Sequence, residues 1–204
     1  MSKHTWLPII LVAIVLVAAS ALFAGDLVSN GSFPSDISGW HLVGRGSLAH
    51  SSDGGAASGA LQIEGGLAGG ATQAVAGQCL SPVTPGQTLQ FGSSVRVVNG
   101  SPAYCRIALF ESAGADCMWI APGAEVRRTT FSGGWDALAG GSLTPGAGTG
   151  SIELRLHCAN ADGQNAALEV RFDDVIVSTG ALGDAIFSDG FETGDTGEWS
   201  SVVP

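Results

Sequence analysis

The chain has 204 residues, a formal net charge of −10, 45% hydrophobic residues, 13% charged residues and 31 glycines. Beyond residue 25 it has no lysine, and seven arginines stand against 18 acids, which gives that part a formal charge of −11. Binding to a phosphate backbone needs clustered basic side chains, so this balance argues against nucleic acid as a partner.

The first 24 residues differ from the rest of the chain. Lys3 precedes an uncharged run, Leu7 to Ala24, that is rich in Leu, Ile, Val and Ala. This pattern predicts an N-terminal hydrophobic signal helix over residues 1–24, cleaved near Ala21 or Ala24. Because the run approaches the ~20 residues that span a bilayer, an uncleaved N-terminal membrane anchor is the alternative. Both forms predict an exported protein that is secreted, periplasmic or held at the cell surface, with no later membrane span.

Residues 25–178 are predicted to form one domain of short β-strands. Apolar and polar residues alternate over 89–97, 152–158 and 168–177, and turns rich in Gly, Pro, Ser and Asn divide the segments. Further strands are expected over 40–43, 60–64, 72–75, 104–110 and 126–131. Nine or ten strands at this spacing, without an amphipathic helix, predict an all-β, two-sheet antiparallel sandwich or a barrel.

The apolar parity changes within the last of these strands. Apolar residues up to Phe172 share one parity, whereas those from Val175 onward share the other. One extra residue must be absorbed at Asp173–Asp174, which predicts a β-bulge there.

Four cysteines form an even set in a chain that we expect to be exported. This favours disulfides over zinc ligation, and the sequence has no CxxC spacing. The strand after Cys105 and the turn at 113–115 would bring Cys105 close to Cys117. We therefore expect the pairs Cys105–Cys117 and Cys79–Cys158.

A series of short landmarks runs through the domain. They are Asn30-Gly31-Ser32-Phe33 through Trp40, Gln78-Cys79 before Pro85, Trp135 before Thr144, and Phe172-Asp173-Asp174-Val175. In this order they resemble the galactose-binding-like jelly-roll carbohydrate-binding modules attached to bacterial cellulases and xylanases. The resemblance covers about residues 26–178. It implies a jelly roll whose first and last strands are neighbours, with Trp40 and Trp135 in the core.

The resemblance also implies a structural calcium as a possible cofactor. Many such modules place an acid after the phenylalanine of the first landmark, but here that position is Pro34. Asp173, at the predicted bulge, is the residue that we expect to bind calcium, which requires hard oxygen ligands. The alternative is that Asp173 and Asp174 only cap or solvate the bulge.

Sugar-binding jelly rolls stack pyranose rings on aromatic side chains, with polar groups nearby. Tyr104 has the opposite parity to Ile107 and should face outward, and Trp119 lies in a loop-like stretch. We predict that Tyr104 and Trp119 form the platform, with Arg106 and Arg155 reading hydroxyl or carboxylate groups. The alternative for Trp119 is that it covers the end of a sheet.

Motifs of catalysis are missing, since the sequence has no GxSxG, HExxH or phosphate-binding glycine loop. We expect no catalytic residue and no enzymatic activity. Glu153 and Glu169 could mimic a glycosidase dyad if they faced each other across neighbouring strands, which leaves a small glycan-active enzyme as a weaker alternative. His41, His50 and His157 have neither triad nor metal spacing and are expected in turns or at the surface.

Residues 179–204 form a predicted linker and acidic tail. The stretch FSDGFETGDTGEW is similar to a short tail at the C-termini of many bacterial secreted proteins. Three interpretations of this stretch remain open: a vestigial first strand of another module, a docking or export tag, or a chance likeness. Together these features predict an exported, non-catalytic module that binds an extracellular glycan or cell-surface polymer. The alternative is a structural or adhesive surface protein that uses the sandwich for protein contacts.

Overall fold

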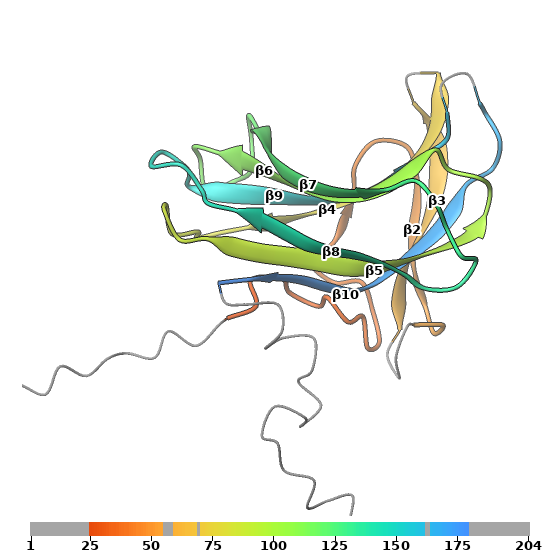
Figure 1. The fold of residues 1–204 in the computed structure, drawn as a ribbon, viewed down its shortest axis with the longest axis horizontal. Coiled ribbons are helices and arrows are strands. Elements are labelled where there is room, and N and C mark those ends of the chain that lie inside the picture. Colours follow the sequence, from red (N-terminus) through yellow and green to blue (C-terminus); the bar gives the residue numbers. More distant parts are fainter. Residues whose placement is uncertain (1–24, 55–58, 69, 162–163, 180–204) are drawn as a thin grey trace, which may run out of the picture.

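A computed structural model describes residues 25–54, 59–68, 70–161 and 164–179. These residues form ten β-strands and no helix, so the predicted all-β class is confirmed (Figure 1). Within the same residues, no helix is long and apolar enough to cross a membrane. The predicted signal helix and the acidic tail lie outside the described residues and stay predictions.

The strands follow one another along the chain with short connections. They are β1 (His41–Leu42), β2 (Gly46–Ser51), β3 (Ala60–Ala68), β4 (Ala71–Leu80), β5 (Leu89–Asn99), β6 (Tyr104–Ser112), β7 (Ala121–Arg128), β8 (Asp136–Leu143), β9 (Ser151–Ala159) and β10 (Glu169–Ser178).

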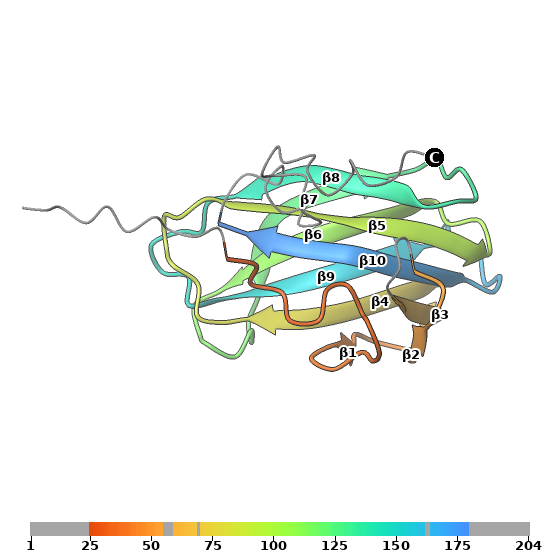
Figure 2. The same cartoon turned by 90° about the horizontal axis from the view of Figure 1, so that it is seen from below.

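All strand pairings are antiparallel and build two layers. Sheet A contains β2, β3, β10, β5 and β8, and sheet B contains β1, β4, β9, β6 and β7. Seen from below, β10 and β5 lie in front of the strands of sheet B and run roughly along them, as expected of an aligned sandwich (Figure 2).

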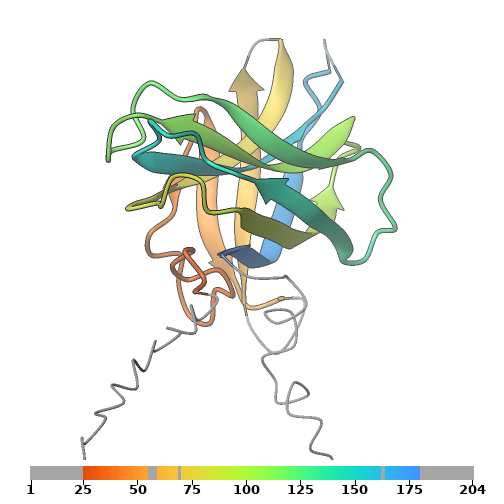
Figure 3. The ribbon, with the colours of Figure 1, turned by 60° about the vertical axis from the view of Figure 1, so that its left-hand side comes forward.

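Strand β3 joins the two sheets. Residues 61–64 pair with β10 of sheet A, whereas 66–68 pair with β4 of sheet B. Figure 3 shows β2 and β3 running steeply across the other strands. The change of sheet occurs at Gly65 and Gly66, where a Cβ on Gly66 would lie 2.6 Å from the backbone of Arg45. A glycine is therefore needed for the β1–β2 loop to approach this corner.

The core lies between the layers and is made by alternate residues of each strand, as the periodicity predicted. Its fully buried large side chains come from both sheets; among them are Leu61, Phe91, Ile107, Leu109, Leu154, Leu156 and Phe172. Trp40 also belongs to the core, with 8% of its surface exposed and its ring 5.5 Å from that of Phe33. The prediction for Trp40 is confirmed.

The prediction for Trp135 is wrong. Its side chain is half-buried and lies outside the core, because β8 places Asp136 and Leu138 on the inward parity. The buried Asp136 carboxylate pairs with Arg128 at 2.8 Å and accepts the N–H of Ser132 at 2.8 Å. This polar anchoring, which periodicity does not reveal, decides which face of β8 turns inward.

The start of the domain is joined to its last strand, as the two terminal landmarks predicted. Asp26 forms a bridge with Ser178, and the Leu27 N–H donates to the Val177 carbonyl at 2.8 Å. Farther on, the Val175 N–H donates to the Gly31 carbonyl at 3.0 Å. A Cβ on Gly31 would lie 2.1 Å from the Val175 oxygen, so this approach requires the glycine.

The predicted bulge in β10 is also confirmed. Pairing with β5 shifts register between Asp173 and Ile176, and Asp174 has a positive φ of 49°. The extra residue restores the inward direction of Val175 and Val177, which are both buried.

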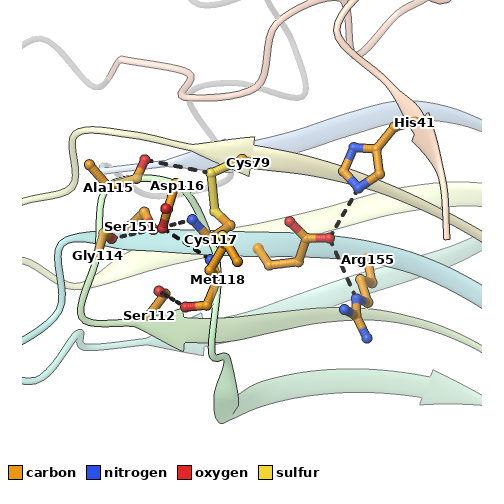
Figure 4. The surroundings of a disulfide bond; sticks show 11 residues. His41, Cys79, Ser112, Gly114, Ala115, Asp116, Cys117, Met118, Ser151 and Arg155 are labelled. Carbon is orange, nitrogen blue, oxygen red and sulfur yellow. Dashed lines mark hydrogen bonds and ion pairs between the residues drawn. A yellow bond between two sulfur atoms is a disulfide. The ribbon is translucent and has the colours of Figure 1, made fainter.

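All four cysteines form disulfides, but the predicted pairing is wrong. The pairs are Cys79–Cys117 and Cys105–Cys158. Strands β6 and β9 are neighbours whose register places Cys105 directly opposite Cys158, and both are buried in the core. Cys117 instead lies in the β6–β7 loop, which reaches over the sheet to the exposed Cys79 on β4 (Figure 4).

Candidate functional site

The outer face of sheet B, which faces away from the core, carries rows of polar residues in register. Because β6 and β9 turn their apolar residues inward, the residues between them point outward. One row runs Arg127, Arg106, His157 and Val75 across β7, β6, β9 and β4. Arg155 lies in the next row, opposite Gly77 of β4.

A pocket of about 320 Å³ opens on this face. Its lining residues come from the β1–β2 loop and three strands; they are Val43, Gly44, Arg45, Gln73, Val75, Arg106, Arg155 and His157. The loop is held at the pocket by the Val43 N–H, which donates to the Val75 carbonyl at 3.0 Å. This volume is near the lower end of the ~300–1,000 Å³ range of ligand pockets. We call this site the sheet B pocket.

His157 lies in the wall of the sheet B pocket and is only 8% exposed, so its predicted surface position is wrong. The Arg106 Nε–H donates to His157 Nδ1 at 3.2 Å. Burial, together with the positive charges of Arg106, Arg155 and Arg127, lowers the pKa of His157 from 6.5 to about 4. The ring is therefore neutral at pH 7, with its proton on Nε2.

Tyr104 shares the outer face with the pocket but does not present a free ring. The guanidinium of Arg127 lies 4.0 Å from the ring centroid, and the His157 ring meets the tyrosine edge-on at 5.3 Å. The prediction that Tyr104 lies on the outer face is confirmed. Its aromatic face, however, is already occupied by a cation–π contact.

Arg155 and Glu153 lie side by side on the outer face of β9. The carboxylate of Glu153 is only 6% exposed, and it lies 3.6 Å from Arg155 Nε and 3.3 Å from His41 Nε2. Figure 4 shows dashed lines from His41 and from Arg155 to one unlabelled carboxylate, which the two distances identify as that of Glu153. Glu153 thus links the β1 segment to the edge of the pocket.

Trp119 does not join the other predicted ligand-binding residues. It is 91% exposed and lies in the β6–β7 loop, whose Met118 carbonyl accepts the Ser112 hydroxyl. Tyr104 begins β6 and Ser112 ends it, so about 26 Å of strand separates the two ends. The structure brings together Tyr104, Arg106 and Arg155, and it places Trp119 at the far end of the sheet.

Asp173 is completely buried at the bulge, where its Oδ1 accepts the N–H of Asp174 at 2.8 Å. Burial and the charge of Asp173 raise the pKa of the Asp174 carboxyl. Within the described ranges, no three His, Cys, Asp or Glu side chains gather as a metal site. A calcium ion there would take most of its six to eight oxygens from backbone carbonyls and water, and it stays a prediction.

The carboxylates Glu153 and Glu169 do not form a dyad. Glu153 lies on β9, between β4 and β6, whereas Glu169 lies on β10, between β3 and β5. The two residues therefore belong to different sheets. The geometry that motivated the weaker enzymatic alternative is not formed.

Among the basic residues in or beside this site, sequence reasoning missed three: Arg45, Arg127 and His157. For His157 a signal was present, because it shares the outward parity of Arg155. The other two depend on tertiary structure. Arg45 reaches the pocket through a loop packed on Gly66, and Arg127 is placed beside the lining residue Arg106 by the register of β7 with β6.

No known family model matches this sequence, and no curated protein is similar enough to match it. Solved structures do match. One, described as "Family 16 Carbohydrate Binding Module-2", has a TM-score of 0.54 and 19% identity, over 74% of this chain and 98% of that chain. The CBM22-2 xylan-binding domain of Paenibacillus barcinonensis Xyn10C has a TM-score of 0.52 and 19% identity, over 78% and 99%.

A third match is the CBM22-1–GH10 part of Clostridium thermocellum xylanase 10B, complexed with xylohexaose. It has a TM-score of 0.57 and 13% identity, over 76% of this chain and 28% of that chain. At these identities the likeness shows a common fold. The described sandwich is thus similar in fold to carbohydrate-binding modules.

Proposed function

We propose that this protein is an exported, non-catalytic module that binds an extracellular glycan through the sheet B pocket. The observation that carries the proposal is a concave polar site on the outer face of a sandwich similar to carbohydrate-binding modules along nearly their whole length. The lining groups Arg45, Gln73, Arg106, Arg155 and His157 are hydrogen-bonding side chains that can orient sugar substituents. Two disulfides support an oxidising, extracellular setting.

The proposal is tested with the purified protein on an array of immobilised neutral and acidic polysaccharides. We expect saturable binding to at least one class, without release of soluble sugar. A second array with Arg155→Gln asks whether binding passes through the pocket. A protein that melts cooperatively and binds no glycan on the array would refute the proposal.

The alternative, an adhesive surface protein, is favoured by a different observation. Met118 and Trp119 are 57% and 91% exposed on a loop that the Cys79–Cys117 disulfide pins to β4. Exposed aromatic and Met side chains are enriched at protein interfaces. Under this alternative, Trp119→Ala abolishes adhesion to a protein-coated surface, and Arg155→Gln leaves that adhesion unchanged.

A further inference from the structure

The sheet B pocket is positively charged on a protein that is otherwise acidic. Three of its eight lining residues are arginines, and none of the eight is an acid. The chain beyond residue 25 has seven arginines against 18 acids, so the lining of the pocket is far more basic than that part of the chain as a whole. A concave site lined by one sign of charge concentrates ligands of the opposite sign. We propose that the pocket binds the carboxylate of an acidic, uronic-acid-containing glycan, an inference that rests on the proposed function.

The positive charges at the site exceed the acids that pair with them. Arg106 pairs with Glu125 at 2.5 Å, and Arg155 lies 3.6 Å from Glu153. Among the residues that the structure describes, neither Arg45 nor Arg127, which lies beside Arg106, has an acidic side chain within 4.0 Å. Four arginines therefore face two carboxylates. With His157 neutral, the site keeps a net positive charge.

Two buried donor atoms at the site, His157 Nε2 and Arg155 Nε, make no hydrogen bond within the described part of the chain. Arg155 Nε faces the Glu153 carboxylate at 3.6 Å in an ion pair, whereas no described acceptor lies within hydrogen-bond distance of His157 Nε2. Nε2 of His157 carries the ring proton, because Nδ1 accepts from Arg106. Buried donors of this kind are normally satisfied. A ligand oxygen in the pocket would accept the hydrogen bond that His157 Nε2 lacks.

The composition of the pocket suits a carboxylate better than a neutral sugar. A sugar hydroxyl donates as well as accepts, whereas an ionised carboxylate only accepts, as arginine side chains and the His157 Nε2–H require. Neutral pyranose rings also favour an open aromatic face, and that of Tyr104 is covered by Arg127 at 4.0 Å. Charge-assisted hydrogen bonds from a guanidinium to a carboxylate are among the strongest available.

The rest of the molecule limits which anions can bind. A formal charge of −11 beyond residue 25 repels a long polyanion such as nucleic acid, although salt screens this repulsion beyond ~8 Å. A pocket of about 320 Å³ has room for one charged sugar unit rather than for a long stretch of polymer. We expect selection for a uronate unit or chain end.

The test is isothermal titration calorimetry of the purified protein with four oligosaccharides. They are an oligogalacturonate, its methyl ester, which has the same backbone without the charge, a neutral xylo-oligosaccharide and a sulfated dextran oligosaccharide, which is acidic but contains no uronate. We expect binding of the oligogalacturonate and loss of affinity for the methyl ester. Arg45→Gln and Arg155→Gln should each weaken binding by about 10- to 100-fold, the range for losing a hydrogen bond to a charged group.

Arg96→Gln is the matched control. Arg96 lies on β5 of sheet A, pairs with Asp53 at 2.9 Å and has a side chain 34% exposed, close to the 30% of Arg155. We expect it to bind as the unchanged protein does. Melting temperatures of all variants check the fold. Arg45, an exposed loop residue that forms no ion pair with the described residues, tests the site even if Arg155→Gln is destabilised.

The outcomes separate this inference from the proposed function. Equal affinity for the acid and its methyl ester, or binding of the neutral oligosaccharide alone, overturns the inference and leaves the glycan-binding function standing. Tighter binding of the sulfated dextran oligosaccharide than of oligogalacturonate overturns the choice of uronate. Acid binding that neither arginine variant weakens overturns the pocket as the site. If the protein binds no ligand in calorimetry and no glycan on the array, the proposed function is refuted as well.

Discussion

Replacing His157 by Gln should reduce the sensitivity of the fold to mild acid. The pKa of His157 is lowered by burial from 6.5 to about 4, so between these two pH values the unfolded chain holds a proton that the folded protein does not. Stability therefore rises with pH through this window and falls as the pH drops from 6.5 toward 4. At pH 7 His157 is mostly neutral in both the folded and the unfolded state, so its protonation destabilises the fold very little there.

The size of this effect follows from the two pKa values. With pKa values of about 4 in the folded state and 6.5 in the unfolded state, one histidine makes the protein about 2 kcal/mol less stable at pH 5 than at pH 7. In His157→Gln this loss disappears, whereas the carboxyl groups titrate as before. The protein should therefore lose about 2 kcal/mol more than the variant over this interval.

Urea unfolding at pH 7 and pH 5 gives the free energy of unfolding at each pH. The test compares how much each protein loses between the two pH values, not its absolute stability. A general destabilisation of the variant does not affect the comparison. Proton NMR of the His157 ring gives an independent reading, with a titration midpoint near pH 4. Equal losses in both proteins, or a midpoint near 6.5, would refute the account of a buried neutral histidine among arginines.

Three further predictions follow from the fold. Non-reducing peptide mapping should recover the pairs Cys79–Cys117 and Cys105–Cys158, and a linked Cys105–Cys117 peptide would contradict the strand register. The double variant Cys79→Ser, Cys117→Ser should lower the free energy of unfolding by up to ~4 kcal/mol, because this disulfide closes a loop of 38 residues. In thermal melts, Trp40→Ala should lower the free energy of unfolding by about 3–5 kcal/mol, and Trp135→Ala, at a half-buried position, should lower it clearly less. Equal losses of stability would place Trp135 in the core after all. A calcium ion held by Asp173 predicts a higher Tm in calcium than in EDTA and no such difference in Asp173→Asn; identical melts of the unchanged protein in both buffers would leave the bulge metal-free.

Much of the sandwich could be predicted because its strands bury one face. Alternation identified β5, β9 and β10, and the change of parity after Phe172 located the bulge to within a residue. Strands β2 and β8 were missed. Their sequences, GSLAHS and DALAGGSL, are rich in Gly, Ala and Ser, which have little intrinsic strand preference. They are strands because they pair with β3 and β5.

The disulfide pairing could have been predicted more closely from parity than from sequence separation. Cys105 and Cys158 share the inward parity of Ile107 and Leu156, so both point into the core. Cys79 lies on the outward parity of β4 and could not reach Cys158 there. The short separation of Cys105 and Cys117 was the wrong criterion, because the loop between them folds back across the sheet.

The site was harder to predict than the fold. Tyr104, Arg106 and Arg155 were chosen by parity, and they do lie on one face. Trp119 was chosen because aromatic residues are scarce, which says nothing of where the loop carries it. The position of Arg45 depends on a loop packed at the corner where β3 changes sheets. No local pattern in the sequence contains that information.

The bridge between Asp26 and Ser178 places the two ends of the described sandwich next to each other. Domains whose ends meet tolerate being cut elsewhere and rejoined, and they can be inserted into a loop of another protein without strain. Anything attached before Asp26 or after Ser178 leaves the sandwich at nearly the same point. The distance from such an attachment to the sheet B pocket is therefore nearly the same whichever end carries it, so a fusion partner can be moved from one end to the other without changing the reach of the binding face.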